Sequence, residues 1–228
     1  MAEIQDLDVK DRKILFYLDK NARASLSEIG RKVRLSQEVV FHRVNKLQEK
    51  GIVKRFQTVV SISKLGYIAP KVYLQLQGIT KEKYQELHNY LINHKNIFWF
   101  GVCQGRWDLL IAYWSKDVIE FGKFADELLY KFGPFILERQ VTIGKNTFQY
   151  NRRWFYHDKL EPVEFEFGSE LGKVGLDGID SEIIKYLANN ARLPVTELSK
   201  LIKTTTNVVH YRIKQLEKSK IISGYKFI

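Results

Sequence analysis

The sequence is nearly devoid of cysteine and contains no long apolar run. Cys103 is the only cysteine among 228 residues, which excludes an intrachain disulfide and any site built from several thiolates. No apolar stretch approaches the roughly 18 residues that cross a bilayer. The first ten residues, MAEIQDLDVK, lack the apolar core of a signal peptide. We therefore expect a cytoplasmic protein with no membrane segment.

Sequence signatures of catalysis are missing as well. The histidines do not have the spacing of metal ligands; they are His42, His88, His94, His157 and His210. The sequence contains neither a glycine-rich loop that would cradle a phosphate nor a nucleophile elbow. Cys103 lies in an apolar segment, where we expect it to be a small buried hydrophobe. The sequence thus predicts no enzyme, no metal site and no cofactor.

The chain has an excess of positive charge, and both of its ends contribute. It holds 37 Lys and Arg against 26 Asp and Glu, a formal net charge of +11. Residues 1–60 carry 13 basic against 8 acidic side chains, and residues 171–228 carry 10 against 5. Because basic side chains displace counterions from a phosphate backbone, this excess favours double-stranded DNA as a partner.

The two ends of the chain also repeat one another. Residues 7–59 align with residues 176–228 without a gap, and the phrase Asn-Ala-Arg at 21–23 recurs at 190–192. Two copies are too few for a solenoid, so the alignment indicates a duplicated domain.

Each copy has the pattern of three helices followed by a short strand. In the first copy, Asp8 and Ser36 are expected helix N-caps, and Ser25 with Glu28 forms a capping box. Gly51 suits the left-handed end of the third helix, and a β-branched run follows it. This order predicts a winged helix-turn-helix. In the second copy Pro194 replaces Ser25 and Lys220 replaces Gly51, so we expect a weaker cap and a different entry into the strand.

The third helix of each copy is expected to face DNA. Val40, Val44 and Leu47 form its inward stripe, which leaves polar and basic side chains outside. Gln37 and His42 are candidates for base contacts. The predicted DNA-binding residues are Ser36, Gln37, Glu38, Phe41, His42, Arg43, Asn45, Lys46, Lys54 and Arg55 in the first copy, and Thr206, Asn207, His210, Tyr211, Arg212 and Lys214 in the second.

Two alternatives remain open at this point. The polar faces of these helices are also what solvated amphipathic helices present, and the second copy could serve protein contact instead of DNA. If both copies touch DNA, their different faces predict different sequence preferences.

Between the copies, the periodicity alternates between strand and helix. The segments 71–78, 97–105, 107–115 and 136–155 are typical of strands, and 81–94 and 118–133 are typical of helices. The order β-α-β-β-α-β favours a four-stranded antiparallel sheet with both helices on one face. The other face would be open, and aromatic residues are available to it: Phe98, Phe100, Tyr113 and Trp114. We expect a second protomer to cover that face.

Residues 7–155 resemble the Lrp/AsnC (feast/famine) family of bacterial and archaeal transcription regulators. The likeness is carried by LDVKDRKILFYLDKNARASLSEIGRKVRLSQEVVFHRVNKLQEKGIVKRF and, less specifically, by GRWDLL at 105–110. The resemblance implies an α+β chain: an N-terminal winged helix-turn-helix, then a ferredoxin-like domain called RAM. It also implies homodimers or higher oligomers, and an amino acid or related effector near Gly105, Trp107 and Asp108. A local alternative is that Asp108 caps backbone groups while Trp107 packs.

The second copy departs from the minimal family layout. The predicted domains are 1–60, 61–158, an acidic linker at 159–175, and 176–228. The linker carries Glu161, Glu164, Glu166 and Glu170, and its glycines predict a partly flexible tether. A dimer would then present four reading helices. One enzymatic alternative remains, because the siroheme decarboxylases are built on a similar two-domain plan.

Overall fold

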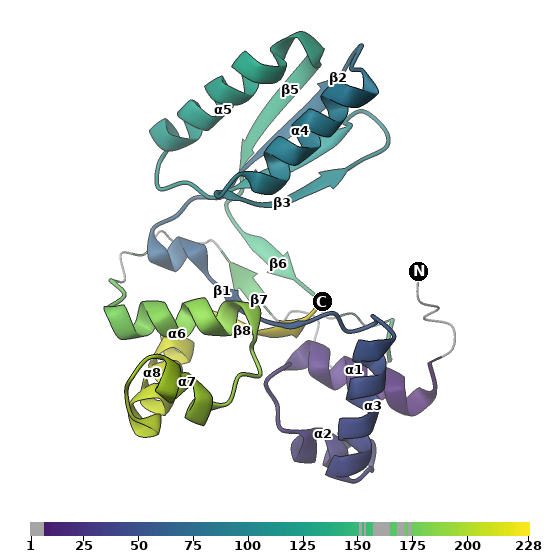
Figure 1. The fold of residues 1–228 in the computed structure, drawn as a ribbon, viewed down its shortest axis with the longest axis vertical. Helices are drawn as coiled ribbons and strands as arrows, with labels where there is room; N and C mark the ends of the chain where they lie inside the picture. Colours follow the sequence, from purple (N-terminus) through teal and green to yellow (C-terminus); the bar gives the residue numbers. More distant parts are fainter. Residues whose placement is uncertain (1–6, 151, 153, 157–164, 168–171, 173–174) are drawn as a thin grey trace. The chain divides into compact units, whose positions relative to one another are not determined.

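The computed structural model describes residues 7–150, 152, 154–156, 165–167, 172 and 175–228 (Figure 1). The chain divides into two compact units. One unit comprises Met1–Ser61, Phe148–Phe167 and Gly175–Ile228, and the other comprises Ile62–Thr147 and Gly168–Val174. Both helix-turn-helix copies therefore lie in a single unit, a grouping that differs from the predicted linear boundaries.

The first copy consists of α1 (Val9–Lys20), α2 (Leu26–Val33), α3 (Gln37–Glu49) and β1 (Phe56–Val60). Its three helices begin as the sequence predicts. The side chains of Asp8, Ser25 and Ser36 each accept a hydrogen bond from a backbone N–H in the first turn. The inward stripe of α3 is also confirmed, since Val40, Val44 and Leu47 are buried.

The second copy consists of α6 (Gly178–Asn189), α7 (Val195–Leu201), α8 (Thr206–Lys218) and β8 (Ile222–Phe227). The weaker cap at Pro194 is confirmed, because no side chain caps α7 there. The expected difference at the strand entry is wrong. Lys220 has φ 60° where Gly51 has φ 69°, so the non-glycine residue adopts the same left-handed turn.

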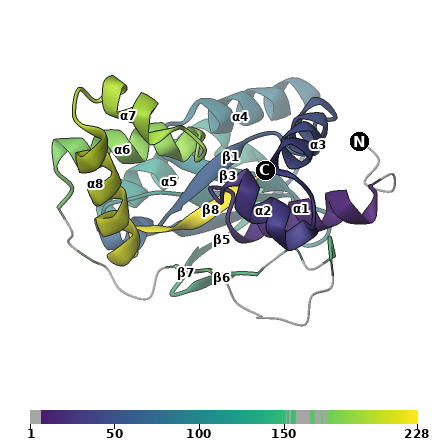
Figure 2. The same ribbon diagram turned by 90° about the horizontal axis from the view of Figure 1, so that it is seen from below.

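The two copies share a two-stranded antiparallel ribbon made of β1 and β8 (Figure 2). Phe56 pairs with Phe227, and Thr58 pairs with Tyr225. Each strand also packs on the opposite copy, β1 on α6 and β8 on α1. The ribbon therefore joins the copies into one body, which we call the paired head. The second copy is therefore held against the first and does not move freely on a tether.

A further ribbon of β6 (Thr147–Gln149) and β7 (Phe165–Phe167) follows the central region. Glu166 of the predicted acidic linker falls in β7. The other three acids of that linker, Glu161, Glu164 and Glu170, lie outside the described residues.

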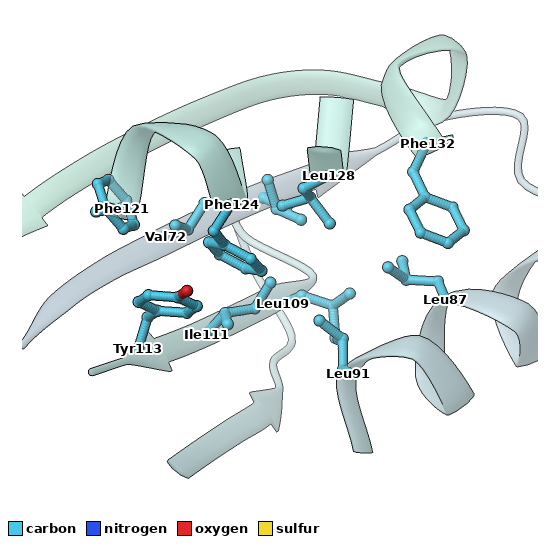
Figure 3. Packing of buried hydrophobic residues seen from close by; sticks show 11 residues of the cluster. Val72, Leu87, Leu91, Leu109, Ile111, Tyr113, Phe121, Phe124, Leu128 and Phe132 are labelled. Atoms are coloured by element: carbon cyan, nitrogen blue, oxygen red, sulfur yellow. The ribbon is translucent and has the colours of Figure 1, made fainter. Parts of the chain in front are cut away.

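The second unit has the predicted ferredoxin-like order. It runs β2 (Pro70–Leu76), α4 (Lys81–Asn93), β3 (Ile97–Val102), β4 (Leu109–Tyr113), α5 (Val118–Phe132) and β5 (Ile136–Ile143), with short 3-10 turns at Ile62–Leu65 and Gly133–Phe135. The sheet order is β3-β4-β2-β5, and all pairs are antiparallel. Val72 and Ile111 from the sheet pack with Leu87, Leu91 and Leu128 from both helices (Figure 3). Both helices thus cover one face.

Two of the four aromatic residues expected on the open face, Tyr113 and Phe100, pack on the core instead. Tyr113 lies in the core, where its ring stacks on Phe124 with centroids 4.3 Å apart (Figure 3). Phe100 also packs on the core, while Phe98 and Trp114 stack on each other.

An irregularity between Ile97 and Trp99 shifts the alternation of β3, and a shift of one residue exchanges faces. The open face also carries Trp99, whose ring lies against Gly101, and Tyr73, which contacts Trp107.

No helix in the part of the chain that the structure describes is both long and apolar enough to cross a membrane.

Candidate nucleic-acid interface

The contacts between the two copies are reciprocal. The N–H of Ala22 donates to the carbonyl of Tyr225 at 3.0 Å, and the N–H of Ala191 donates to the carbonyl of Phe56 at 2.9 Å. Ala191 is the repeat equivalent of Ala22, and Tyr225 is the equivalent of Phe56. Each contact therefore has its counterpart, which gives the paired head an approximate two-fold relation.

Two equivalent arginines complete this interface. Arg23 donates to the carbonyls of Ala191 and Leu193, and Arg192 donates to the carbonyl of Ala22 at 2.7 Å. The guanidinium of Arg23 lies over the ring of Tyr225, and that of Arg192 lies over the ring of Phe56. Burial lowers the pKa of Arg192, and the charge of Arg23 adds to this. The repeated phrase Asn-Ala-Arg thus lies where the copies meet.

One further cluster breaks the two-fold relation. The carboxylate of Asp19, fully buried, accepts from the backbone N–H of Arg152 at 2.8 Å and lies 3.4 Å from the Lys226 ammonium. The guanidinium of Arg152 donates to the carbonyl of Phe227. The residue equivalent to Asp19 is Ala188, so only one side has this cluster. Sequence reasoning missed it, although the charge mismatch at equivalent inward positions was a usable signal.

Arg43 and Arg212, both predicted DNA-binding residues, have carboxylate partners inside their own copies. Arg43 lies 2.6 Å from Asp8 and 2.7 Å from Asp11. Arg212 makes the equivalent pairs with Asp177 at 2.8 Å and Asp180 at 3.4 Å. Each arginine therefore fastens the third helix of its copy to the first.

These pairs shift acid pKa values in different directions. Burial opposes the change at Asp8, but the N–H of Asp11 and the Arg43 guanidinium lower the pKa of the Asp8 carboxyl. At Asp180, burial and then the neighbouring Asp177 raise the pKa. Arg212 lies closer to Asp177 than to Asp180, and the N–H of Asp180 lowers the pKa of the Asp177 carboxyl.

The outward faces of α3 and α8 hold most of the other predicted DNA contacts. Asn45 is half-buried, and the remaining ones are exposed: Gln37, Glu38, Phe41, His42, Lys46, Lys54, Arg55, Thr206, Asn207, His210, Tyr211 and Lys214. Ser36 is also exposed, and its hydroxyl accepts from the N–H of Val39 as the N-cap. The large rings are notable here, because Phe41 is 48% exposed and Tyr211 60%.

A surface cavity of about 450 Å³ adjoins α3. Its lining includes His42, Arg43 and Lys46, together with Asp8 and Asp11. Three of the predicted DNA contacts therefore converge beside the start of α1.

The predicted effector residues are only partly brought together. The Asp108 carboxylate accepts from the N–H of Leu76 at 2.7 Å, so it caps the end of β2. It also lines a cavity of about 330 Å³ with Tyr84 and Cys103, whereas Gly105 and Trp107 do not line it. Gly105 has φ 129°, a conformation that favours glycine.

Cys103 is half-buried, not fully buried as the sequence suggested. Among the described residues, no group of three or more His, Cys, Asp or Glu side chains is placed to hold a metal ion.

Comparison with known proteins matches both copies to one family model. Residues 7–54 and 176–223 each match the model for winged helix-turn-helix DNA-binding domains. The chain is 36% identical over 124 residues to the HTH-type transcriptional regulator Ptr1 of Methanocaldococcus jannaschii, a match that covers 54% of this chain and 82% of that protein.

Solved structures resemble the chain over two different extents. An AsnC family transcriptional regulator from Agrobacterium tumefaciens has a TM-score of 0.56 at 18% identity and covers 64% of this chain and 95% of its own. The transcriptional regulator NMB0573 of Neisseria meningitidis in complex with L-Met has a TM-score of 0.57 at 21% identity and covers 64% and 94%. The siroheme decarboxylase NirDL has a TM-score of 0.63 at 12% identity and covers 96% of this chain and 65% of its own. At these identities the likeness shows the fold alone.

Proposed function

The chain belongs to the Lrp/AsnC family of helix-turn-helix transcription regulators, and from this premise we propose that its paired head is one complete DNA-binding unit. The observation that carries the proposal is the reciprocal interface between the copies. Two-fold-related helix-turn-helix units usually belong to two subunits and place their reading helices in major grooves one helical turn apart, about 34 Å. Here both units belong to one chain, so the duplication supplies the second reading helix that a partner subunit usually provides.

In this proposal α3 and α8 enter successive major grooves. The side chains near the start of each helix, such as Gln37 and Asn207, reach base edges. Lys46 and Lys54 neutralise phosphates. Arg43 and Arg212 act as positioning residues, because each fastens a reading helix to the first helix of its own copy.

The test is selection of bound duplexes from a random pool, followed by footprinting of the full chain. We expect an enriched site with protection in two major grooves one turn apart. Affinity should fall with salt by a log-log slope of about −0.9 for each phosphate neutralised. Protection confined to one groove, or an affinity that does not respond to salt, would contradict the proposal.

The sheet unit has a separate proposed role in self-association and effector binding. Its open face carries Trp99, which is 49% exposed, and Tyr73, whose ring contacts Trp107. Exposed aromatic surface of this kind favours a protein partner. Sedimentation of the full chain against a Trp99→Asp variant tests self-association, and a matching monomer fraction for both proteins would argue against it.

An amino acid is the proposed effector, since the related fold of NMB0573 was solved with L-Met. The cavity beside Asp108 is the proposed site, with the carboxylate available to an ammonium group. Calorimetric titration with a panel of amino acids tests this, and Asp108→Asn should weaken the binding of any that bind. If no amino acid binds at millimolar concentration, the assignment fails.

One observation favours an enzymatic alternative, the siroheme decarboxylase fold that spans 96% of this chain. We propose the regulator because the named relative at 36% identity is a transcriptional regulator. Titration with an iron tetrapyrrole separates the two functions. The regulator should give no stoichiometric change in the visible spectrum, while tight binding with loss of a carboxyl group would establish the enzyme.

A further inference from the structure

The two reading faces of the paired head differ in chemistry although their scaffolds match. The buried residues of α3 recur almost unchanged in α8, where Val209, Ile213 and Leu216 replace Val40, Val44 and Leu47. The outward residues do not recur. From the first copy to the second, they change from Gln37, Glu38, Phe41, His42, Asn45 and Lys46 to Thr206, Asn207, His210, Tyr211, Lys214 and Gln215.

These differences change which bases each helix can recognise. Glu38 gives α3 an acid in its first turn, whereas α8 has none there. A carboxylate accepts from the amino group of cytosine, and the Gln37 amide fits adenine. In α8, Asn207 fits adenine and Lys214 can donate to guanine. The two helices therefore cannot share one optimal half-site.

The interface fixes the two faces relative to each other. The β1-β8 ribbon, the crossed backbone bonds of Ala22 and Ala191, and the two arginines all join the copies within one body. Neither reading helix can turn independently to suit a reversed half-site. The Asp19 cluster on one side only adds a structural difference between the two ends of the head.

We infer that one chain reads a single non-palindromic duplex site and binds it in one orientation, with α3 on one half and α8 on the other. This rests on the proposed function, since it assigns the sequence class of the same DNA site. An ordinary dimer with identical reading helices presents the same face twice and has no preferred direction. A single copy of this chain would therefore bind the DNA in one preferred orientation.

The experiment compares selected sites for the full wild-type chain with those for two exchange variants. In the first variant, α3 receives the face of α8 through Gln37→Thr, Glu38→Asn, Phe41→His, His42→Tyr, Asn45→Lys and Lys46→Gln. The matched reverse variant carries Thr206→Gln, Asn207→Glu, His210→Phe, Tyr211→His, Lys214→Asn and Gln215→Lys. All these positions are exposed except the half-buried Asn45, so the scaffold should fold in both variants.

The wild-type chain should select a site with two unlike halves. Each exchange variant should select a different palindrome, and each palindrome should repeat one half of the wild-type site. Wild-type affinity for either palindrome should be at least about tenfold weaker, because each mismatched base pair costs about 5- to 150-fold.

A wild-type site in which the half under α3 and the half under α8 are inverted copies of one sequence would overturn the inference while leaving the proposed function intact. Wild-type selection of only one half-site, with no sequence preference under α8, would overturn it as well. If no duplex is enriched at all, the proposed function fails together with the inference. Circular dichroism of both variants checks that they fold. A variant that has lost helix is left out of the comparison, and the site selected by the wild-type chain then decides whether the inference holds.

Discussion

Replacing Arg192 by alanine tests the interface that joins the two copies. The change removes the hydrogen bond to the carbonyl of Ala22 and the contact with the ring of Phe56. A hydrogen bond from a charged group contributes about 1.5–3 kcal/mol, and a cation-π contact about 0.5–1 kcal/mol. Relief of the burial that lowers the pKa of Arg192 offsets part of this loss. We therefore expect the free energy of opening the interface to fall by about 2 kcal/mol.

Amide hydrogen exchange measures this opening directly. The N–H groups of Ala22 and Ala191 donate across the interface, so they exchange only when the copies separate. A loss of 2 kcal/mol should speed their exchange by about 30-fold. The equivalent change Arg23→Ala should act on the same two amides, since the interface is reciprocal. Amides of the sheet unit, such as that of Val72, should keep their wild-type rates.

Arg31→Ala is the matched control, because Arg31 is exposed on α2. Substitution there should change stability by less than about 0.5 kcal/mol. The reasoning is refuted if the amides of Ala22 and Ala191 exchange as slowly in the Arg192→Ala variant as in the Arg31→Ala variant. In that case the arginines do not hold the copies together.

Three other outcomes follow from particular contacts. Burial and then the Glu217 carboxylate raise the pKa of Tyr225 above its usual 10; because the folded pKa is the higher one, the associated stability is present below about pH 10 and lost above it. Tyr225→Phe should therefore reduce the alkaline loss of stability in thermal melts, and identical wild-type and variant profiles would oppose this. Lys46→Ala should lower the salt slope of DNA binding by about 1, whereas Arg43→Ala should lower it less; equal changes would argue that Arg43 meets a phosphate. Asp19→Asn should lower the urea midpoint by more than Glu49→Gln at an exposed site, as measured by circular dichroism, because it weakens a buried ion pair.

Local structure in each copy could be predicted from the sequence. The caps at Asp8, Ser25 and Ser36, and the buried stripe of α3, are short-range features that need only residue type and spacing. The order of elements in the sheet unit could be predicted for the same reason. Family membership followed from the resemblance of residues 7–56 and, less specifically, of GRWDLL at 105–110.

The association of the two copies could not be predicted, because strand pairing between residues 56–60 and 222–227 is non-local. The exposed face of a short strand does not specify its partner. The irregularity between Ile97 and Trp99 similarly interrupts the alternation of β3, which an alternation rule cannot anticipate. Lys220 shows a third limit, since the fold imposed a left-handed turn on a residue other than glycine.

The central claim, that the two copies of one chain form one DNA-binding head, is tested most directly by a covalent lock across the ribbon. Val59 pairs with Gly224 in the register of β1 and β8, and paired antiparallel strands have the Cα separation that a disulfide needs. The variant combines Val59→Cys and Gly224→Cys with Cys103→Ser, so that only the two new thiols can join. The measurement is the DNA affinity of the oxidised protein. We predict a disulfide within one chain and an affinity equal to that of the reduced form; a disulfide between chains, or binding that returns only on reduction, would contradict the account.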